Sequence, residues 1–280
     1  MTTRTPFFIE DSDGFSPTEA CTGYWQSGTI SGRVVGGLLG FVLERAYGGD
    51  DLVPARFSLD LLRPPPRARL RPELRLLRDG GRLKLGHVDL YAGDTLVAHA
   101  ACQFLRRTEN PPAQTWQAPG WDAPPPEALS GDSSSGHWDL RPIPADRRTS
   151  RRPPPAVLLE APRRTANPPV LGPMGPFEAR QAWVREVRGL VDDLPLTPFT
   201  RVALAADFAS PLAHSSPDSI DYVNSDFTVY MHRLPRSEWL GFDLVKHHAA
   251  DGIAIGECWL HDTEGPLGTV TVAAIAQRQR

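Results

Sequence analysis

Two segments of this chain share one pattern, and their repetition limits what the chain can fold into. Phe57–Pro64 is an extended apolar run that ends in arginine and proline, and Phe227–Pro235 has the same character. Further strand-like runs follow both copies, at 83–91 and 95–105 in the first half and at 239–245, 254–260 and 269–276 in the second. A helical stretch precedes each copy. Because an internal duplication determines the fold of both halves together, we expect two similar units, each with one helix and four strands.

Between the two copies the chain is rich in proline. Much of the total of 29 prolines lies in Pro111–Pro176. Proline fixes the backbone and removes a hydrogen-bond donor, so such a stretch favours extended, weakly paired chain. We therefore expect an N-terminal domain over 1–108, a linker over 109–154 and a C-terminal domain over 155–280. The basic run Arg147–Arg152 could attract phosphate, but a solvated linker is the simpler interpretation.

Each half has one stretch with helical spacing. In the first half, Ser31 can cap a helix whose apolar residues run from Val34 to Leu43, and glycines at 36, 37 and 40 would let it lie close against a sheet. In the second half, Pro198–Phe208 plays the same part, with Thr197 as its cap. One helix of small residues per half, against strands of alternating pattern, predicts an α+β fold in which antiparallel sheet wraps around helix.

The composition favours a small-molecule partner. The 280 residues are 40% hydrophobic and 22% charged, and the net charge of −3 gives no reason to expect nucleic acid or an anionic membrane. Three scattered cysteines fit neither a disulfide framework nor a zinc site, which suggests a reducing cytoplasm. The first residues lack the apolar core of a secretion signal, and no later run is long enough for a membrane span.

Several motifs together resemble one known family. They are Leu196–Phe208, Asn224–Arg233, Glu238–Trp239 and Leu260–Gly268 in the second half, and the helix after Ser31, Asp60–Pro64 and Arg78–Arg82 in the first. In order and spacing they resemble acyl-CoA thioesterase II-type proteins. The resemblance implies a double hotdog, in which two antiparallel sheets, each wrapped around a central helix, join as a pseudo-dimer. It also implies a role in lipid metabolism.

The same resemblance implies three catalytic positions that orient a water on a thioester carbonyl. An aspartate at the end of the second helix matches Asp207, and a threonine or asparagine one strand later matches Asn224. A glutamine is expected on the last strand, where counting from Gly265–Gly268 places Val272. Gln277 is too far along to replace it, because an odd shift along a strand changes the face on which a side chain lies. The chain therefore departs from the family at this position.

Thioester hydrolysis needs a held water, a group that takes its proton, and donors for the developing oxyanion. Partial burial would raise the pKa of Asp207 and make it a base, and the amide of Asn224 could fix the water. Backbone amides of Gly32, Arg33 and Val34 could polarise the carbonyl. The alternative is that Asp207 merely caps a turn after its helix.

Three further residues are candidates for contact with substrate: Val272, Tyr222 and Thr228. Aromatic residues on strands, Tyr222 among them, could line an acyl tunnel, although they are more often ordinary core. In the family a glycine pair often begins the first helix. Here the pair is Gly32-Arg33, and we expect the arginine to narrow or charge the entrance.

Three functions remain open. The leading hypothesis is hydrolysis of acyl-CoA or a related acyl thioester, with no metal or bound cofactor, and with no covalent intermediate because the chain has no GxSxG motif. Val272 supports a second hypothesis, a hotdog protein that binds acyl chains or acyl-CoA without turnover. The third is hydration or dehydration of an enoyl thioester, with His214 or His232 as partner to the aspartate.

Two remaining features concern metal binding and assembly. His247-His248 and His261-Asp262 could suggest a metal site, but adjacent histidines on a strand point to opposite faces. A double hotdog could pair again through exposed sheet edges, so we expect a homodimer or tetramer.

Overall fold

The structure is a computed structural model that describes residues 4–23, 26–112, 116–118, 120–131, 138–147, 180–215 and 220–277. The helices are α1 (Gly32–Tyr47), α2 (Pro198–Ala205) and α3 (Ala209–His214), with single 3₁₀ turns η1 (Glu19–Cys21), η2 (Pro126–Ala128), η3 (Ala145–Arg147) and η4 (Ala206–Phe208). The strands of the first half are β1 (Phe8–Asp11), β2 (Gly14–Pro17), β3 (Leu52–Leu61), β4 (Leu70–Asp79), β5 (Leu83–Ala92) and β6 (Thr95–Arg106). Those that follow are β7 (Trp138–Pro142), β8 (Gln181–Glu186), β9 (Tyr222–Asn224), β10 (Asp226–Met231), β11 (Trp239–Ala250), β12 (Ile253–Asp262) and β13 (Gly265–Ala276).

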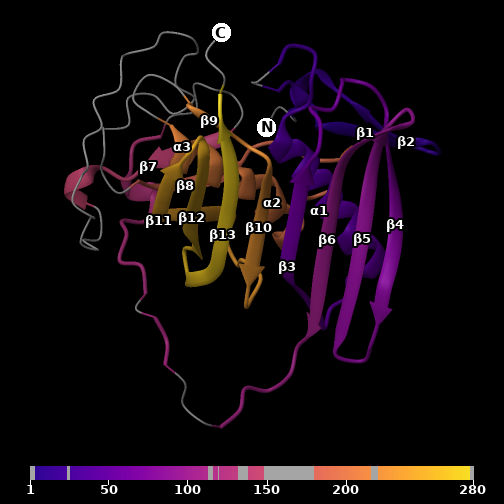
Figure 1. Ribbon diagram of the computed structural model, residues 1–280. Coiled ribbons are helices and arrows are strands. Elements are labelled where there is room, and N and C mark those ends of the chain that lie inside the picture. Colours follow the sequence, from indigo (N-terminus) through magenta and orange to yellow (C-terminus); the bar gives the residue numbers. More distant parts are fainter. Residues whose placement is uncertain are drawn as a thin grey trace.

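The described strands form one antiparallel sheet that runs through both halves (Figure 1). Its order is β1-β2-β4-β5-β6-β3-β10-β13-β12-β11-β8-β7, and β9 pairs with β13 beside this path. The two repeated segments meet at its centre, because β3 pairs with β10 and places Leu59 opposite Phe227 and Phe57 opposite Val229. The resemblance implied two sheets joined as a pseudo-dimer, and here the join is a hydrogen-bonded pairing of edge strands. The edge strand of each half satisfies the backbone groups of the other, so neither inner edge is left open.

The helix expected after Ser31 is present as α1, which packs on β3, β4, β5 and β6. The apolar residues at helical spacing are buried as predicted: Val34, Val35, Leu38, Leu39, Val42 and Leu43. Strand β4 was not expected from the sequence. It contains Pro72 and has an irregular register between Leu76 and Arg78, and most of its length is exposed, so it lacks the alternating pattern of a half-buried strand.

The helical segment of the second half is longer than expected and is broken. The predicted Pro198–Phe208 begins as α2, with the Thr197 hydroxyl accepting a hydrogen bond from the Thr200 amide at 3.0 Å. It then tightens into η4 and continues as α3, which packs on β9, β11, β12 and β13. Asp207 lies in the η4 turn. The break therefore places a carboxylate in the middle of a helical segment rather than at its end.

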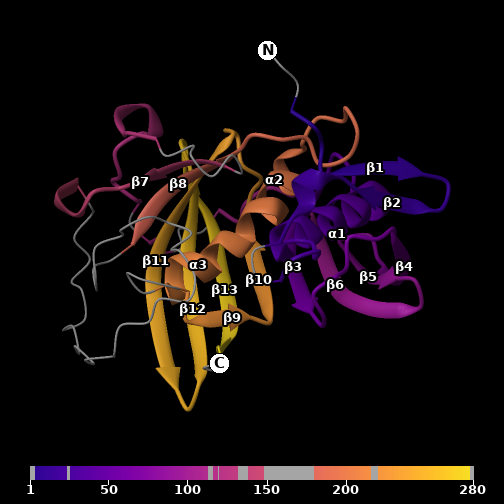
Figure 2. The ribbon, with the colours of Figure 1, turned by 90° about the horizontal axis from the view of Figure 1, so that it is seen from above.

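The glycines of α1 face helix α2, not the sheet alone. A Cβ on Gly40 would lie 2.6 Å from the Cβ of Ala203, and a Cβ on Gly36 would lie 2.8 Å from Cζ of Phe227. Figure 2 shows α3, α2 and α1 following one another across the same side of the sheet. At Gly36 the missing side chain brings this helix close to the sheet, as expected, and at Gly40 it brings the helices of the two halves together.

The range expected to be a linker contains a strand and part of a second core. Strand β7 pairs with β8, and Trp121 stacks on Trp183 and His261 with ring centroids 5.0 and 4.7 Å apart. A side chain at Gly241 would overlap the Trp121 ring, so this position must be small. Trp183, Trp239, Leu129 and Ile143 are buried in the same cluster. Part of the proline-rich region therefore covers the outer face of the second half. Of the basic run, residues 148–152 lie outside the described residues.

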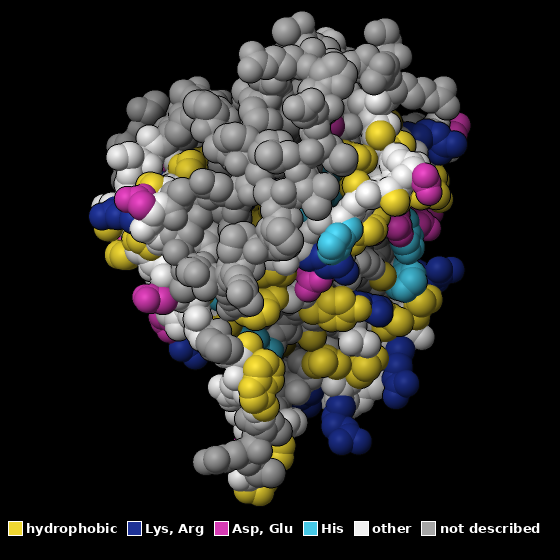
Figure 3. Space-filling view, turned by 60° about the vertical axis from the view of Figure 1, so that its left-hand side comes forward, with side chains coloured by type: hydrophobic (Ala, Val, Ile, Leu, Met, Phe, Trp, Pro, Cys, Tyr) yellow, Lys and Arg dark blue, Asp and Glu magenta, His cyan; other side chains and the backbone are white. Residues whose placement is uncertain are grey.

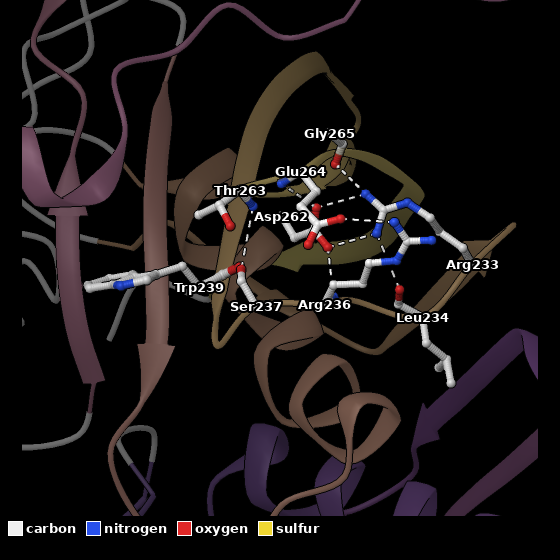
Figure 4. A network of polar contacts seen from close by, with 9 residues as sticks. All are labelled: Arg233, Leu234, Arg236, Ser237, Trp239, Asp262, Thr263, Glu264 and Gly265. Carbon is white, nitrogen blue, oxygen red and sulfur yellow. Dashed lines mark hydrogen bonds and ion pairs between the residues drawn. The ribbon is translucent and has the colours of Figure 1, made fainter.

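The arginine of the second repeat anchors the β12–β13 hairpin (Figure 4). Both nitrogens of the Arg233 guanidinium donate to the Asp262 carboxylate at 2.7 Å, and the amides of Arg236 and Glu264 donate to it at 2.8 and 2.9 Å. Burial alone would raise the pKa of Asp262, but these hydrogen bonds outweigh it and lower the pKa. The motifs around Arg233 and Asp262 thus hold the β12–β13 hairpin against the end of β10.

The surface shows no single dominant charge on the face in Figure 3, where basic, acidic and apolar side chains are interspersed over the described residues. Among the helices of the described part of the chain, none combines the length and apolar character that crossing a bilayer requires.

Candidate active site

Asp207 and Asn224 meet at the η4 turn. Nδ2 of Asn224 donates to Oδ1 of Asp207 at 2.8 Å, and the Asn224 side chain is buried. Asn224 ends the short strand β9, which pairs with the last strand β13. The two residues that the sequence singled out as the catalytic pair are therefore in direct contact, although they come from a helical turn and a strand 17 residues apart.

The first turn of α1 lies against the same carboxylate. The backbone amide of Arg33 donates to Asp207, and a Cβ on Gly32 would lie 3.5 Å from both carboxylate oxygens. The amide of Val34 instead donates to the carbonyl of Ser31 at 3.0 Å. Three amides were expected to polarise a substrate carbonyl. The amide of Val34 is instead hydrogen-bonded within the first turn of the helix, and the amide of Arg33 is hydrogen-bonded to Asp207. The Gly32 amide lies at the first helical position, where no intrahelical acceptor exists.

The environment of Asp207 favours its protonated form. Burial raises the pKa of this carboxyl, while the hydrogen bond from Asn224, the charge of Arg33 and the Arg33 amide oppose the rise. The net shift is upward. Asp207 is therefore more than the cap of a turn after its own helix, because its hydrogen bonds come from the other half and from β9.

Arg33 does not place a free charge at this site. Its side chain is buried and forms an ion pair with Glu186 at the end of β8, with both side chains less than 5% exposed. The guanidinium lies over the rings of Trp138 and Phe7, 4.5 and 5.0 Å from their centroids. Glu186 also accepts hydrogen bonds from the amides of Val187 and Arg188. The expectation that Arg33 charges the entrance is thus corrected: its charge is balanced by a carboxylate of the other half.

On the last strand, Ala274 lies directly opposite Asn224. Val272 is fully buried one pleat further along, opposite Gly256 and beneath α3. Gln277 donates to the carbonyl of Ile220 at 2.8 Å, so its amide is engaged elsewhere. Apolar side chains, Ala274 and Val272, therefore occupy this part of β13, and the departure from the family stays a prediction. The exposed residue Ser225 separates β9 from β10 and changes the register, which counting could not reveal.

The two remaining candidates for substrate contact, Tyr222 and Thr228, lie on opposite faces of the sheet. Tyr222 is two residues from Asn224 on β9, so their side chains share one face of the strand. Thr228 lies between Phe227 and Val229, which are fully buried on the side of the helices. The Thr228 side chain therefore lies on the opposite face of the sheet, and the structure separates it from Asp207.

Two participants in this arrangement were not found from the sequence. Glu186 lies at the end of a strand that was not predicted, and Ala274 carries no chemical signal of its own. In the described residues no group of three or more His, Cys, Asp or Glu side chains is placed to hold a metal ion. His261 is instead covered by Trp121.

Residues 122–275, more than half of the chain, match the family of the acyl-CoA thioesterase C-terminal domain. The chain belongs to the acyl-CoA thioesterase family. No curated protein matches it by sequence. The match covers Asp207, Asn224 and the whole of the second repeat, so the resemblance found in the motifs is confirmed.

Solved structures of this thioesterase family and its fold are similar to the chain over most of its length. An acyl-CoA thioesterase II from Mycobacterium marinum is 18% identical, with a TM-score of 0.62, covering 88% of this chain and 90% of its own. A TesB protein from Mycobacterium avium subspecies paratuberculosis is 18% identical, with a TM-score of 0.63, and the match covers 94% of this chain and 93% of that protein. A hotdog-fold protein of unknown function from Alicyclobacillus acidocaldarius is 15% identical, with a TM-score of 0.66, and the match covers 98% of this chain and 96% of that protein. At these identities the likeness establishes the hotdog fold.

Proposed function

We propose that this protein hydrolyses acyl-CoA or a related acyl thioester, with Asp207 as the base. One observation carries the proposal: the carboxylate of Asp207 contacts Asn224 and the first turn of α1 at the junction of the two halves. Membership of the thioesterase family supports the substrate class. The structural relatives support a hotdog architecture, and we propose that the two halves form a double hotdog with α1 and the α2–α3 segment as its central helices.

The proposed reaction proceeds without a covalent intermediate. A water held by Asn224 and Asp207 gives a proton to the carboxylate while its oxygen bonds to the thioester carbonyl carbon. The amide of Gly32 and the positive end of the α1 dipole stabilise the oxyanion. When the C–S bond breaks, the CoA sulfur leaves and takes up the proton, which yields a free acid and a thiol. The raised pKa of Asp207 brings the base closer to the pH at which it works.

The test is Asp207→Asn, assayed on a panel of acyl-CoA substrates. General-base catalysis contributes on the order of 10²- to 10⁴-fold, so kcat/KM should fall by that factor. Asp226→Asn is the matched control. Asp226 is also a partly buried carboxylate with a raised pKa, and it accepts the Ala273 amide at 2.7 Å, but its strand position places it on the outer face. Equal turnover in wild type and Asp207→Asn would reject Asp207 as the base.

A second function, acyl-CoA binding without turnover, is favoured by the apolar side chains of Ala274 and Val272 beside the site. In that case the wild type would bind a non-hydrolysable thioether analogue of acyl-CoA but release no thiol from the thioester. Ala274→Gln, which places an amide opposite Asn224, should then create hydrolysis. Val272→Gln serves as the comparison, because its side chain lies beneath α3. Hydrolysis by the wild type makes this second function unnecessary.

A further inference from the structure

Buried polar groups that the proposed reaction does not use continue along the helix from Asp207. Ser210 and His214 are 1% and 2% exposed, and both belong to α3. At three and seven residues from Asp207 they share its face of the helical segment, and His214 lies two turns, about 10 Å, further along.

Three polar atoms on this face have no hydrogen-bond partner among the described residues: Oγ of Ser210 and both ring nitrogens of His214. Nearly all buried polar side-chain atoms in proteins are hydrogen-bonded, so such atoms indicate a partner from outside the chain. Ser210 and His214 lie on the same face of α3, so their unpaired atoms form a group and are not isolated buried polar atoms.

This row of groups follows β9 as well as the helix. Asp207 contacts Asn224, and the His214 ring lies 5.8 Å from the ring of Tyr222, whose side chain shares the face of Asn224. The helical segment and β9 therefore run alongside each other, with Asp207 at one end of their contact and His214 at the other. On the far side, His214 lies 5.2 Å from the ring of His247, which is exposed.

The partner of His214 must be able to meet a neutral imidazole. Burial, with the charges of His247 and Arg180, lowers the pKa of His214 to about 4, so near pH 7 one ring nitrogen donates and the other accepts. The Ser210 hydroxyl also does both. A hydroxyl group matches this set, because it too can donate and accept.

We propose that Ser210 and His214 form a subsite for a hydroxyl group on the acyl chain of the substrate, about two helical turns from the thioester. The inference rests on the proposed function for the position of the thioester at Asp207. A plain acyl chain would leave the buried Ser210 and His214 groups unpaired, and sites of this kind discriminate strongly against an analogue that lacks the hydroxyl. The subsite thus selects hydroxylated over unsubstituted acyl chains of suitable length.

The experiment uses thioether analogues of acyl-CoA, which bind but cannot be hydrolysed. Pairs that differ only by a terminal hydroxyl are compared over a series of chain lengths by calorimetric titration of the full chain. We expect the wild type to bind the hydroxylated member at least about tenfold more tightly at one length. His214→Phe should reduce this ratio to near one, and Ser210→Ala should reduce it in part. His248→Phe is the matched control, because His248 is exposed and lies on the face of β11 opposite to His247.

The outcomes separate this inference from the proposed function. Hydrolysis of acyl-CoA with equal binding of both analogues at every length would overturn the subsite, which would then hold only water, and leave the proposed function intact. A hydroxyl preference that His214→Phe removes would support the subsite even if no thioester is hydrolysed. If His214→Phe shows no cooperative thermal transition and so does not fold, the test uses Ser210→Ala instead. The subsite is then supported if Ser210→Ala lowers the ratio of the two binding affinities, and overturned if the ratio stays at its wild-type value. Failure of every hydroxylated analogue to bind also overturns the subsite.

Discussion

The two halves of this protein repeat one plan but contribute different chemical groups to their junction. The first half has an unbroken helix of 16 residues, and its first turn presents backbone amides. The second half has a helical segment that tightens at η4, and this break presents the carboxylate of Asp207. The first half thus supplies backbone donors to the junction, and the second half supplies a carboxylate. The same sequence position need not serve the same purpose in both halves.

The outer faces of the halves differ as well. Trp121 packs on the outer face of β8 and β11 in the second half, where Trp183 and Trp239 are buried, and β7 extends the sheet beside β8. In the first half strand β4 is mostly exposed, including Leu74 and Leu77 at 42% and 46%. Within the described residues, the connecting region therefore contributes buried side chains to the core of the second half. Five predictions test how far the halves differ and how they depend on each other, beginning with the largest effect.

The ion pair between Arg33 and Glu186 should be the most sensitive point of the junction. Glu186→Ala leaves a buried guanidinium without its carboxylate, and the free energy of unfolding should fall by about 3–5 kcal/mol in a denaturant titration. Arg45 and Glu10 provide the control, because their ion pair is 49% and 30% exposed and Glu10→Ala should cost about 1 kcal/mol or less. Equal losses in the two variants would show that the buried pair does not hold the halves together.

The arginines of the repeat test the difference directly. Arg233→Ala leaves the buried Asp262 without its two guanidinium bonds and should destabilise the protein by about 1.5–3 kcal/mol at pH 7. The guanidinium of Arg63 in the first copy donates to the carbonyl of Leu96, at 2.9 Å, and the residue is exposed. Arg63→Ala should therefore change the stability by about 0.5 kcal/mol or less.

The sign of the pH effect follows from the pKa of Asp262, which is lowered in the folded protein. A carboxyl with a lowered pKa adds stability that is fully present above its unfolded pKa, about 3.9, and is lost as the pH falls through its folded pKa. The difference between wild type and Arg233→Ala should thus shrink when unfolding is measured at increasingly acid pH below 4. A difference that stays constant would contradict an ionic role for Asp262.

Much of this architecture could be predicted from the sequence, and the misses have physical causes. The regular apolar spacing after Ser31 predicted α1, because it is a local signal, although the expected capping hydrogen bond from the Ser31 side chain is not formed. Asp207 and Asn224 were found through the family motifs, and the family match covers both. Strand β7 was missed because proline dominates its region, and β4 because Pro72 and its exposed charges hide the alternation. The residue opposite Asn224 was missed because register depends on pairing between distant strands.

The glycines of α1 offer a test in which two effects oppose each other. Gly40→Ala improves the helix propensity by about 1 kcal/mol, but the new Cβ would meet that of Ala203 at 2.6 Å. Because overpacking costs about 1–3 kcal/mol, we expect a net loss of about 1 kcal/mol in thermal unfolding. Adding Ala203→Gly should restore part of it by removing the clash. Ala46→Gly, at an exposed position of the same helix, measures propensity alone. Stabilisation by Gly40→Ala would show that the helices can move apart.

The smallest expected change is a shift of the pH profile caused by Asn224. The hydrogen bond from Asn224 favours the charged form of Asp207 and so opposes the rise that burial causes in its pKa. Asn224→Ala removes this support, and the pKa of Asp207 should rise further. Since the proposed base acts when deprotonated, the acid limb of the kcat/KM profile should move to higher pH. The value of kcat/KM at pH values well above this limb reports separately on the loss of water positioning. Ser225→Ala is the control on the same segment, because Ser225 is exposed and its hydroxyl bonds only the carbonyl of Ala273, at 3.4 Å. An acid limb that stays in place in Asn224→Ala would mean that the group titrating in the profile is not the carboxyl of Asp207.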